Sequence, residues 1–268
     1  MVYTASVLLV YSVRAGQEFV KAANKLRFRE EQTMTEHKVL THDDWVDARK
    51  ALLAKEKDFT RMRDALSRER LELPWERVEK NYVFDGPNGK ESLSDLFDGR
   101  SQLIVYHFMY GPDWNEGCKS CSFLADHFNP AIDHLNNRDV SMVSVSTAPL
   151  PVLEAFKKRM GWAFKWVSSF DNDFNRDYHV SFTQEENDGG KTYYNYEQRG
   201  FPSTEAPGAS VFYKDANGEI YHTYSAYARG LDMFLTAYHY LDIVPKGRDE
   251  EHLSFTMEWV RLHDAYDS

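Results

Sequence analysis

Apolar residues recur at seven-residue intervals in one stretch of the chain, with charged residues between them. Thr41 and Asp44 resemble a capping box at its start, and Pro74 stops it. This spacing predicts one long helix over 41–73 with a single apolar stripe. The stripe consists of Trp45, Leu52, Phe59, Leu66 and Leu73, with Ala48 and Met62 on the same face.

The pattern allows two packing partners for the apolar stripe. It can dock on the chain's own domain or pair with a second subunit as a homodimer through the 41–73 helix. About four heptads are only the lower limit for a coiled coil, so intramolecular docking is favoured. The charged residues on the other faces form an ordinary solvated surface.

Beyond Pro74 the pattern alternates between short strands and helices. A mixed sheet follows, parallel at its centre, with an antiparallel hairpin at one side that turns at 215–218. The expected strands are 82–84, 103–108, 140–145, 165–169, 210–213 and 219–224, and the expected helical segments are 119–136, 149–160, 174–180 and 231–241.

Two segments carry weaker patterns. Residues 1–40 form a poorly defined extension, with a possible strand at 2–13 and helical composition at 17–30. Residues 184–206 have no convincing periodicity, and a loop of that length is often functional or mobile. Its tyrosines, Tyr193 to Tyr196, favour a packed surface flap over a lid that covers the site.

The resulting domain organisation has four parts. The extension at 1–40 is followed by a helical arm at 41–80, an α/β domain at 81–250 and a tail at 251–268. We expect a central mixed sheet flanked by helices, with a long N-terminal helical arm.

Composition and charge exclude some classes of partner. The 268-residue chain has a formal net charge of −10, which opposes binding to nucleic acid. No stretch reaches the roughly 18 apolar residues of a membrane helix, so we expect no membrane partner. The apolar run at 5–13 lacks a preceding basic residue, which favours a cytoplasmic location over a secretory signal.

Two cysteines are present, in the arrangement Cys118-Lys119-Ser120-Cys121. They follow a predicted buried strand and open a predicted helix, which is the setting of a thioredoxin-type dithiol. Helix N-terminal N–H groups favour thiolate, the attacking species in disulfide exchange. The spacing therefore predicts Cys118 as the nucleophile and Cys121 as the resolving thiol.

Two other interpretations of the cysteines stay open. A zinc or copper site would need further ligands, for which His107, His127 and His134 are available. Alternatively, the cysteines pack in a redox-inert scaffold. We expect no metal and no cofactor.

Pro207 is the second element of the predicted site. It precedes the strand at 210–213, where a thioredoxin site has a proline in cis that faces the dithiol and leaves neighbouring groups free to hold an extended substrate. Ala206 is expected to share this contact with substrate, and Pro202 is the rival candidate.

Three segments carry a resemblance to a known family. They are similar to a family of thioredoxin-like proteins long catalogued as a domain of unknown function, whose members resemble the thioredoxin and peroxiredoxin superfamily. The similarity runs from about Lys38 to near the C-terminus, and residues 1–35 do not resemble the family's usual start. The segments are LIVYHFMYGPDWNEGCKSCSF (103–123), KKRMGWAFKWVSSFDNDFN (157–175) and APGASVFYKDANGEIYHTYSAYARGLDMFLTAYHYLDIVPKGRDE (206–250).

The resemblance implies a thioredoxin-like fold, with Cys118 and Cys121 as the dithiol and Pro207 opposite it. It also draws attention to the run Tyr106-His107-Phe108 at the end of the central strand, with His107 as a proton shuttle for the resolving thiol, and to Trp114 near substrate. A strand-end histidine bonded to backbone is an equal alternative for His107. Asp113, expected in the same loop as Trp114, suits a turn better than acid-base chemistry.

The predicted function is that of a thiol-disulfide oxidoreductase. Its substrate would be a protein or small-molecule disulfide or thiol, and an external reductant would restore the pair. A peroxiredoxin-like peroxidase is the enzymatic alternative. Against it, the signature Pro-x-x-x-Thr/Ser-x-x-Cys is out of order: Pro112 precedes Glu116, and Cys118 occupies the hydroxyl position before Cys121.

Overall fold

The long helix predicted after Thr41 is present as α2, His42–Leu71. The Asp44 amide donates to Thr41 Oγ1 at 3.3 Å, and the Thr41 hydroxyl donates to the Asp44 carboxylate at 2.7 Å. No side chain of α2 is buried, and the five stripe residues are 43 to 65% exposed. Docking of the stripe stays a prediction.

The computed structural model describes residues 37–266. The predicted strand at 2–13 and helix at 17–30 lie outside them. The described residues separate into two compact units: residues 37–62 with 240–252, and residues 63–239 with 253–266, which contain the sheet and the cysteines. The predicted boundaries near 80 and 250 stay predictions.

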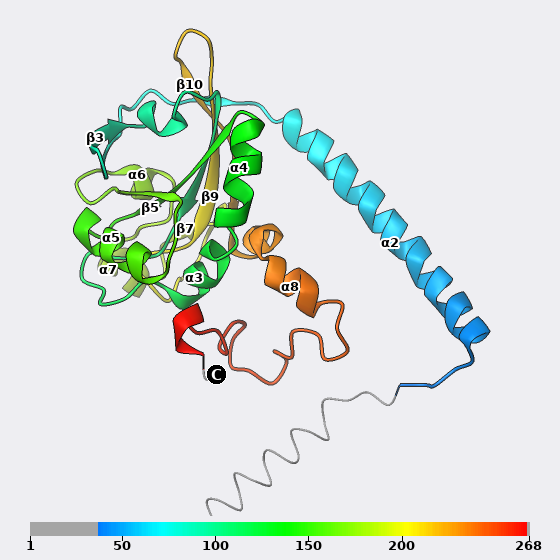
Figure 1. The fold of residues 1–268 in the computed structure, drawn as a ribbon. Helices are drawn as coiled ribbons and strands as arrows, with labels where there is room; N and C mark the ends of the chain where they lie inside the picture. The colour runs from blue at the N-terminus through cyan, green and yellow to red at the C-terminus, as the bar shows by residue number, and fades with distance from the viewer. Residues whose placement is uncertain (1–36, 267–268) are drawn as a thin grey trace, which may run out of the picture. The chain divides into compact units, whose positions relative to one another are not determined.

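One sheet of eight strands has the order β1-β10-β9-β4-β5-β6-β2-β3. Strands β4, β5 and β6 run parallel, and β9 and β10 form the predicted antiparallel hairpin, drawn in gold in Figure 1. The strands are β1 Glu76–Arg77, β2 Val83–Gly86, β3 Gly89–Ser92, β4 Gln102–His107, β5 Val140–Ser146, β6 Lys165–Ser168, β9 Gly208–Lys214 and β10 Ile220–Tyr227. A separate small hairpin pairs β7 Tyr193–Tyr194 with β8 Glu197–Gln198.

The helices of the sheet-bearing unit are short. They are α3 Lys119–Ala125, α4 Asn129–Asn137, α5 Leu150–Arg159, α6 Phe174–Asp177, α7 Gln184–Asp188 and α8 Thr236–Leu241, with 3₁₀ turns η1 Asp95–Phe97, η2 Ala228–Phe234 and η3 His263–Ala265. The single helix expected over 119–136 is wrong, since the chain forms α3 and α4 there. Pro130 lies in the first turn of α4, where its missing N–H is tolerated, whereas it would break a continuous helix. The helix expected over 231–241 is a 3₁₀ turn followed by α8.

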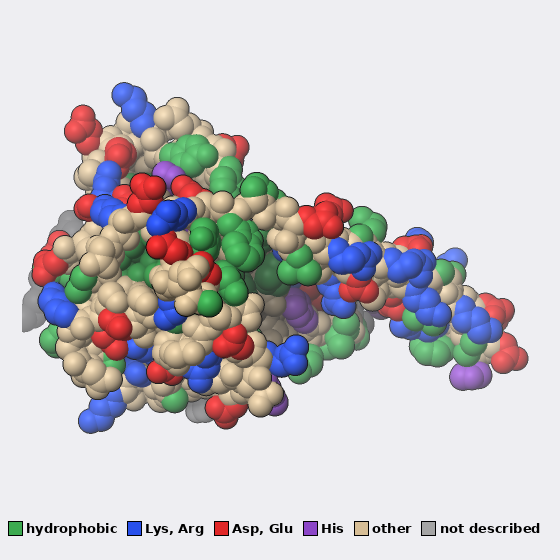
Figure 2. Space-filling model, turned by 90° about the horizontal axis from the view of Figure 1, so that it is seen from above, with side chains coloured by type: hydrophobic (Ala, Val, Ile, Leu, Met, Phe, Trp, Pro, Cys, Tyr) green, Lys and Arg blue, Asp and Glu red, His purple; other side chains and the backbone are tan. Residues whose placement is uncertain are grey.

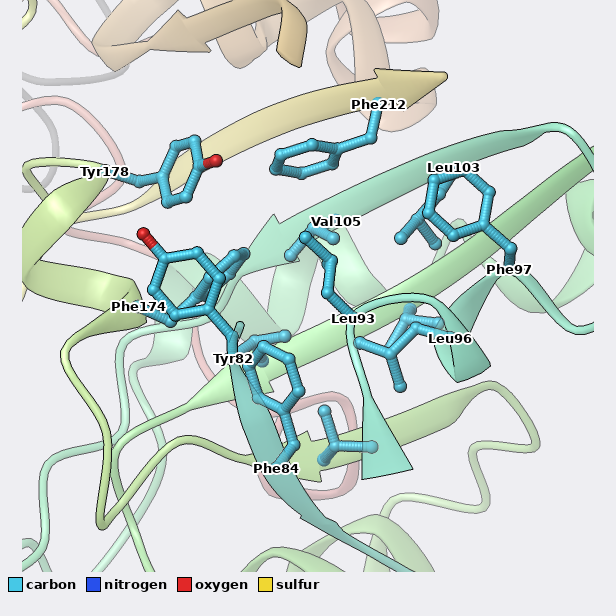
Figure 3. Close-up of a cluster of buried hydrophobic side chains, with 13 residues drawn as sticks. Tyr82, Phe84, Leu93, Leu96, Phe97, Leu103, Val105, Phe174, Tyr178 and Phe212 are labelled. Carbon is cyan, nitrogen blue, oxygen red and sulfur yellow. The ribbon is translucent and has the colours of Figure 1, made fainter. Parts of the chain in front are cut away.

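Each face of the sheet carries its own apolar layer. On one face, Phe108, which follows β4, contacts Trp166 of β6 at a centroid distance of 4.6 Å, and α5 adds Phe156. On the other face, Val105 belongs to a buried cluster that includes Phe174 of α6 (Figure 3). Since side chains alternate along a strand, neighbouring residues of β4 belong to different layers.

The order of elements around β4 defines the fold. A parallel βαβ unit of β4, α3 with α4, and β5 is followed, after further elements, by the antiparallel hairpin of β9 and β10, which returns to the other side of β4, and then by α8. This mixed sheet flanked by helices is the thioredoxin-like fold, with α2 as a long N-terminal helical arm. Within residues 37–266, no helix has the length and apolarity needed to cross a bilayer.

Candidate active site

Cys118 is the N-cap residue of α3. The loop that follows β4 brings it there, and the Cys118 amide donates to the carbonyl oxygen of Met109 at 3.1 Å. Its Sγ accepts the Cys121 amide at 3.5 Å, and its carbonyl oxygen accepts the Ser122 hydroxyl at 2.9 Å. Both cysteines are free thiols; Cys118 is half-buried and Cys121 is 2% exposed. The structure places the two cysteines after the buried strand β4 and at the start of α3; their role as a redox dithiol stays a prediction.

The two thiols have opposite pKa shifts. A hydrogen bond from the Cys121 thiol, aided by the Cys121 and Ser120 amides, lowers the pKa of Cys118 to about 7 against the opposing effect of burial. Burial, and then the bond to Cys118, raise the pKa of Cys121 well above its ordinary value. The half-buried sulfur is therefore the more readily ionised one, as a nucleophile requires.

Tyr106 is a member of this site that sequence reasoning noticed only as part of a strand-end run. Its side chain is buried, and its hydroxyl bonds to Cys121, a contact that lowers the pKa of that thiol. Burial, and then the two cysteines, raise the pKa of Tyr106 itself. Strand alternation could have shown which face of β4 it occupies, but the identity of its partner required the fold.

His107 lies in the other layer of the sheet. Its Nε2 is 2.9 Å from Ser210 Oγ, and its ring stacks on Phe174 and Tyr178. Burial lowers the pKa of His107 to about 3, so the ring is neutral across the physiological range. Since Tyr106 and not His107 faces Cys121, the geometry gives no support to a proton-shuttle role for His107, and we do not propose one.

From His107, a chain of polar contacts through two serine hydroxyls leads to the surface. Ser210 Oγ is 2.9 Å from Ser225 Oγ, which is 2.7 Å from His222 Nε2. His222 in turn lies 3.4 Å from a carboxylate oxygen of the exposed Glu76. These contacts supply hydrogen-bond partners for the buried Ser210 hydroxyl and for Nε2 of His107, as buried polar groups require.

Pro207 directly precedes β9, and the register of the sheet sets Gly208 opposite His107. The expected cis bond before Pro207 is wrong, because every described peptide bond is trans. The Ala206 amide donates to the Val180 carbonyl at 2.8 Å, and Gly208 begins the ladder of β9, so the chain stays extended through the proline. Gly208 cannot carry a side chain, since a Cβ would lie 2.9 Å from the Tyr227 ring.

The other predicted contact residues occupy different settings. Ala206 is buried and its amide is already bonded, whereas Pro207 is half-buried. Trp114 is half-buried against Gly111 in a tight turn, where its amide donates to the Gly111 carbonyl. Asp113, in the same turn, and the rival Pro202 are exposed.

The segment 184–206, expected to be irregular, contains α7 and the β7–β8 hairpin. Tyr194 is 2% exposed, and its hydroxyl donates to the Pro207 carbonyl at 2.8 Å and accepts the Ala228 amide at 2.9 Å. The Cys121 charge contributes to the raised pKa of Tyr194, after the larger effect of burial. The segment is thus packed into the core through Tyr194, while Tyr193 and Tyr196 are exposed.

Glu205 is a buried carboxyl group that sequence reasoning missed. It is 6% exposed and accepts the hydroxyls of Thr147 at 2.9 Å and Ser181 at 2.8 Å. Burial outweighs these bonds and raises the pKa of Glu205 to about 7. Its neighbourhood in sequence, Ser203 to Ala206, reads as an ordinary loop, so no sequence signal marked it.

Among the described residues, no further metal ligands lie with the cysteines. Over residues 37–266, no group of three or more His, Cys, Asp or Glu side chains could hold a metal ion. His127 accepts the Ala237 amide at 3.2 Å, and His134 is exposed. The two free thiols are therefore partnered only by hydrogen bonds, to each other, to backbone amides and to Tyr106.

Comparisons with known proteins give one family and a set of solved structures. A search of curated proteins finds no match. Peroxidoxin BcpB from Mycobacterium tuberculosis is 12% identical, with a TM-score of 0.41 over 61% of this chain and 94% of that one. A peroxiredoxin Q variant from Xanthomonas campestris is 15% identical, with a TM-score of 0.42 over 63% and 98%. The mitochondrial 2-Cys peroxiredoxin from Plasmodium falciparum is 17% identical, with a TM-score of 0.37 over 61% and 92%.

The family match covers both the dithiol and the helical arm. The model described as "Bacterial protein of unknown function (DUF899)" matches residues 34–266, which include α2, Cys118, Cys121 and Pro207. The chain therefore belongs to this family, DUF899.

Proposed function

We propose that the protein is a thiol-disulfide oxidoreductase that uses Cys118 and Cys121. The observation that carries the proposal is the unequal pair itself: a half-buried thiol with a lowered pKa, bonded to a buried thiol with a raised pKa. No cationic side chain is among the groups that shift the Cys118 pKa. Amide and thiol hydrogen bonds therefore supply the activation.

The reaction follows from the order in which the two sulfurs ionise. The Cys118 thiolate attacks one sulfur of a substrate disulfide, the substrate S–S bond breaks, and the leaving thiolate takes a proton from solvent. Cys121 then loses its proton and attacks Cys118 Sγ, which releases the second substrate thiol and leaves a protein disulfide. Two electrons have passed to the substrate, and an external dithiol reductant returns them.

Tyr106 and Pro207 have separate roles in the proposed reaction. The Tyr106 hydroxyl bonds to Cys121 and would stabilise its thiolate as it forms during resolution. Pro207 lies beside the end of β4, where a substrate chain could contact it, and Trp114 adds a half-buried ring in the preceding loop. The Ala206 amide is already used, so Pro207 is the better candidate for substrate contact.

The test is reduction of insulin disulfides by the full-length protein with dithiothreitol as the external reductant. We expect Cys118→Ser to abolish the catalysed rate and Cys121→Ser to trap a mixed disulfide at Cys118. Ser120→Ala, between the two cysteines, is the matched control and should retain activity. An unchanged rate in Cys118→Ser would overturn the proposal.

A second measurement separates reduction from peroxidase chemistry. Peroxide added to the reduced protein would convert a peroxidatic cysteine to a sulfenic acid, which dimedone traps. Rapid trapping together with inactivity toward insulin would favour the peroxidase alternative. The reduction potential of the pair then indicates whether it reduces or oxidises its substrates.

A further inference from the structure

The sheet-bearing unit has a cavity of about 820 Å³ along β10. All the residues that line it belong to this unit, and neither cysteine is among them. Its volume is in the range of small-molecule sites. Part of its wall is apolar or aromatic, with Leu73, Pro74, Tyr196, Tyr224 and Ala226 among the lining residues.

Three polar residues of the same wall are joined in a line. Ser225 Oγ is 2.7 Å from His222 Nε2, and His222 Nδ1 is 3.4 Å from Glu76 Oε2. The pairing of β1 with β10 sets Glu76 directly opposite His222. Residues three apart in a regular strand point to opposite faces, but the register shifts between His222 and Tyr224 and so lets Ser225 reach His222.

The order hydroxyl, imidazole, carboxylate is that of a serine nucleophile, its base and the group that orients the base. A carboxylate only accepts hydrogen bonds, so Glu76 favours the proton of the neutral His222 ring on Nδ1. Nε2 is then free to accept the Ser225 hydroxyl. On its other side, Ser225 Oγ lies 2.9 Å from Ser210 Oγ, which can donate to it and direct the Ser225 proton toward His222.

The same surroundings suit the charged ring that forms when Ser225 gives up its proton. An imidazolium has two N–H groups to satisfy. Nδ1 faces the Glu76 carboxylate, and Nε2 lies 3.1 Å from the carbonyl oxygen of Tyr224. Both N–H groups therefore have acceptors in place before the reaction begins.

We propose that this cavity is an esterase site in which Ser225 is the nucleophile, His222 is the general base and Glu76 is a positioning residue. Ser225 is 6% exposed, so the substrate has to reach it through the cavity. The apolar part of the wall fits an uncharged carboxylic ester with an apolar acyl group. Figure 2 shows acidic and basic side chains interspersed over one face of the sheet-bearing unit, which gives that face no strong field of one sign to attract a charged substrate.

The reaction is a hydrolysis and needs no oxidant or reductant. Ser225 Oγ attacks the ester carbonyl carbon while its proton passes to His222 Nε2, and the C–O bond to the alcohol then breaks as the alcohol takes that proton. Water attacks the acyl group on Ser225, with His222 again as base. The carboxylic acid leaves, and Ser225 recovers its proton. The dithiol takes no part.

The first test uses the full-length protein with Cys118→Ser and Cys121→Ser, because thiols also react with activated esters. A fluorophosphonate probe should label Ser225, as read by mass spectrometry, and the protein should hydrolyse p-nitrophenyl butyrate. We expect Ser225→Ala to lose the catalysed rate and His222→Gln to lower it by about 100-fold. Ser254→Ala, at an exposed serine outside the cavity, is the control and should keep the rate.

Labelling of the unmutated cavity makes the test independent of how well the variants fold, and circular dichroism checks the fold of each. Absence of label at Ser225, or an equal rate in a folded Ser225→Ala protein, would overturn the proposal. Since both cysteines are replaced, neither result bears on the thiol-disulfide chemistry.

The second test concerns Glu76. Glu76→Gln removes the negative charge beside His222 Nδ1, so the protonated ring loses a stabilising partner. We expect the acid limb of the pH profile of kcat/KM to move to lower pH, a change that loss of structure alone would not produce. Glu79→Gln, at an exposed site outside the cavity wall, is the matched control. Identical pH profiles for the two variants would contradict the role of Glu76.

Discussion

The hydroxyl of Tyr194 donates a hydrogen bond to the carbonyl oxygen of Pro207 at 2.8 Å. The same hydroxyl accepts the Ala228 amide, so one buried side chain joins the 184–206 segment to the start of β9 and the end of β10. This contact ties the position proposed to meet substrate to a segment that looks irregular in sequence.

Tyr194→Phe should therefore affect both stability and catalysis. It leaves the Ala228 amide without its acceptor, at a cost of about 1–3 kcal/mol in the free energy of unfolding. It also releases Pro207, so we expect a higher KM for a disulfide substrate with a smaller change in kcat. Urea unfolding and insulin reduction measure the two effects, and Tyr193→Phe, at the exposed neighbour, is the control. Equal KM values for Tyr194→Phe and Tyr193→Phe would contradict a role of Pro207 in substrate binding.

Alkylation by iodoacetamide should show the unequal thiols directly. Because only thiolate reacts, the rate at Cys118 should rise with pH, reach half its maximum near pH 7 and then level off. Cys121 should stay unreactive over this range, since its pKa is raised and its side chain is buried. Mass spectrometry of each peptide gives the two profiles; a fast phase at Cys121 would reverse the assigned roles.

Tyr106→Phe should slow the second half of the reaction. Without the hydroxyl the Cys121 pKa rises further, because the bond from Tyr106 lowers it. We expect mixed disulfide between substrate and Cys118 to accumulate, while the initial rate of attack by Cys118 is unchanged. Quenched-flow samples on non-reducing gels measure the intermediate. If the intermediate decays at the wild-type rate, Tyr106 has no role in resolution.

Glu205 should make stability fall as pH rises. In the unfolded chain its carboxyl ionises with the ordinary pKa of 4.5, whereas the folded group keeps its proton until about pH 7. Stability from this group is complete below pH 4.5 and is lost as pH rises through 7, by about 3 kcal/mol at most. In urea unfolding, the free energy of unfolding of Glu205→Gln should therefore rise relative to that of wild type between pH 5 and pH 8. Glu185→Gln, at an exposed site, controls for the change in net charge, and a parallel pH dependence in Glu205→Gln and wild type would contradict the assignment.

His107→Gln tests the separation of the two sheet layers. Loss of the Ser210 contact in the core should cost about 1–3 kcal/mol. The pKa of His107 is about 3 in the folded protein and 6.5 in the unfolded chain. The contribution of the neutral ring to wild-type stability is therefore complete above pH 6.5 and is lost as the pH falls toward 3. The His107→Gln variant should not show this loss. The alkylation profile of Cys118 should not move. A shifted profile would restore His107 as a partner of the dithiol.

The predicted elements that held best were those defined by local pattern. The strand at 103–108 and the 215–218 turn between β9 and β10 follow from a buried apolar run and from turn residues. The helix over 119–136 was wrong because its composition hid a break before Pro130. The 184–206 segment was underestimated because its short elements depend on Tyr194 entering the core, which no local pattern records.

Some residues of the candidate site could likewise be predicted from local pattern, and others could not. Cys118 and Cys121 were found from their spacing and from the strand before them, and the stripe of α2 from its period of seven. His107 was grouped with the dithiol on the family resemblance, although the alternation of β4 turns Tyr106 toward Cys121 and His107 away.

By itself, the sequence determined the dithiol, the mixed sheet that presents it and the long amphipathic arm, because each depends on residues that are neighbours along the chain. Only the tertiary structure decided which groups tune the sulfurs, that Tyr194 holds Pro207, and that Glu205 is buried. Hydrogen bonds and desolvation act between residues far apart in sequence, so these contacts and the resulting pKa values exist only once the chain is folded.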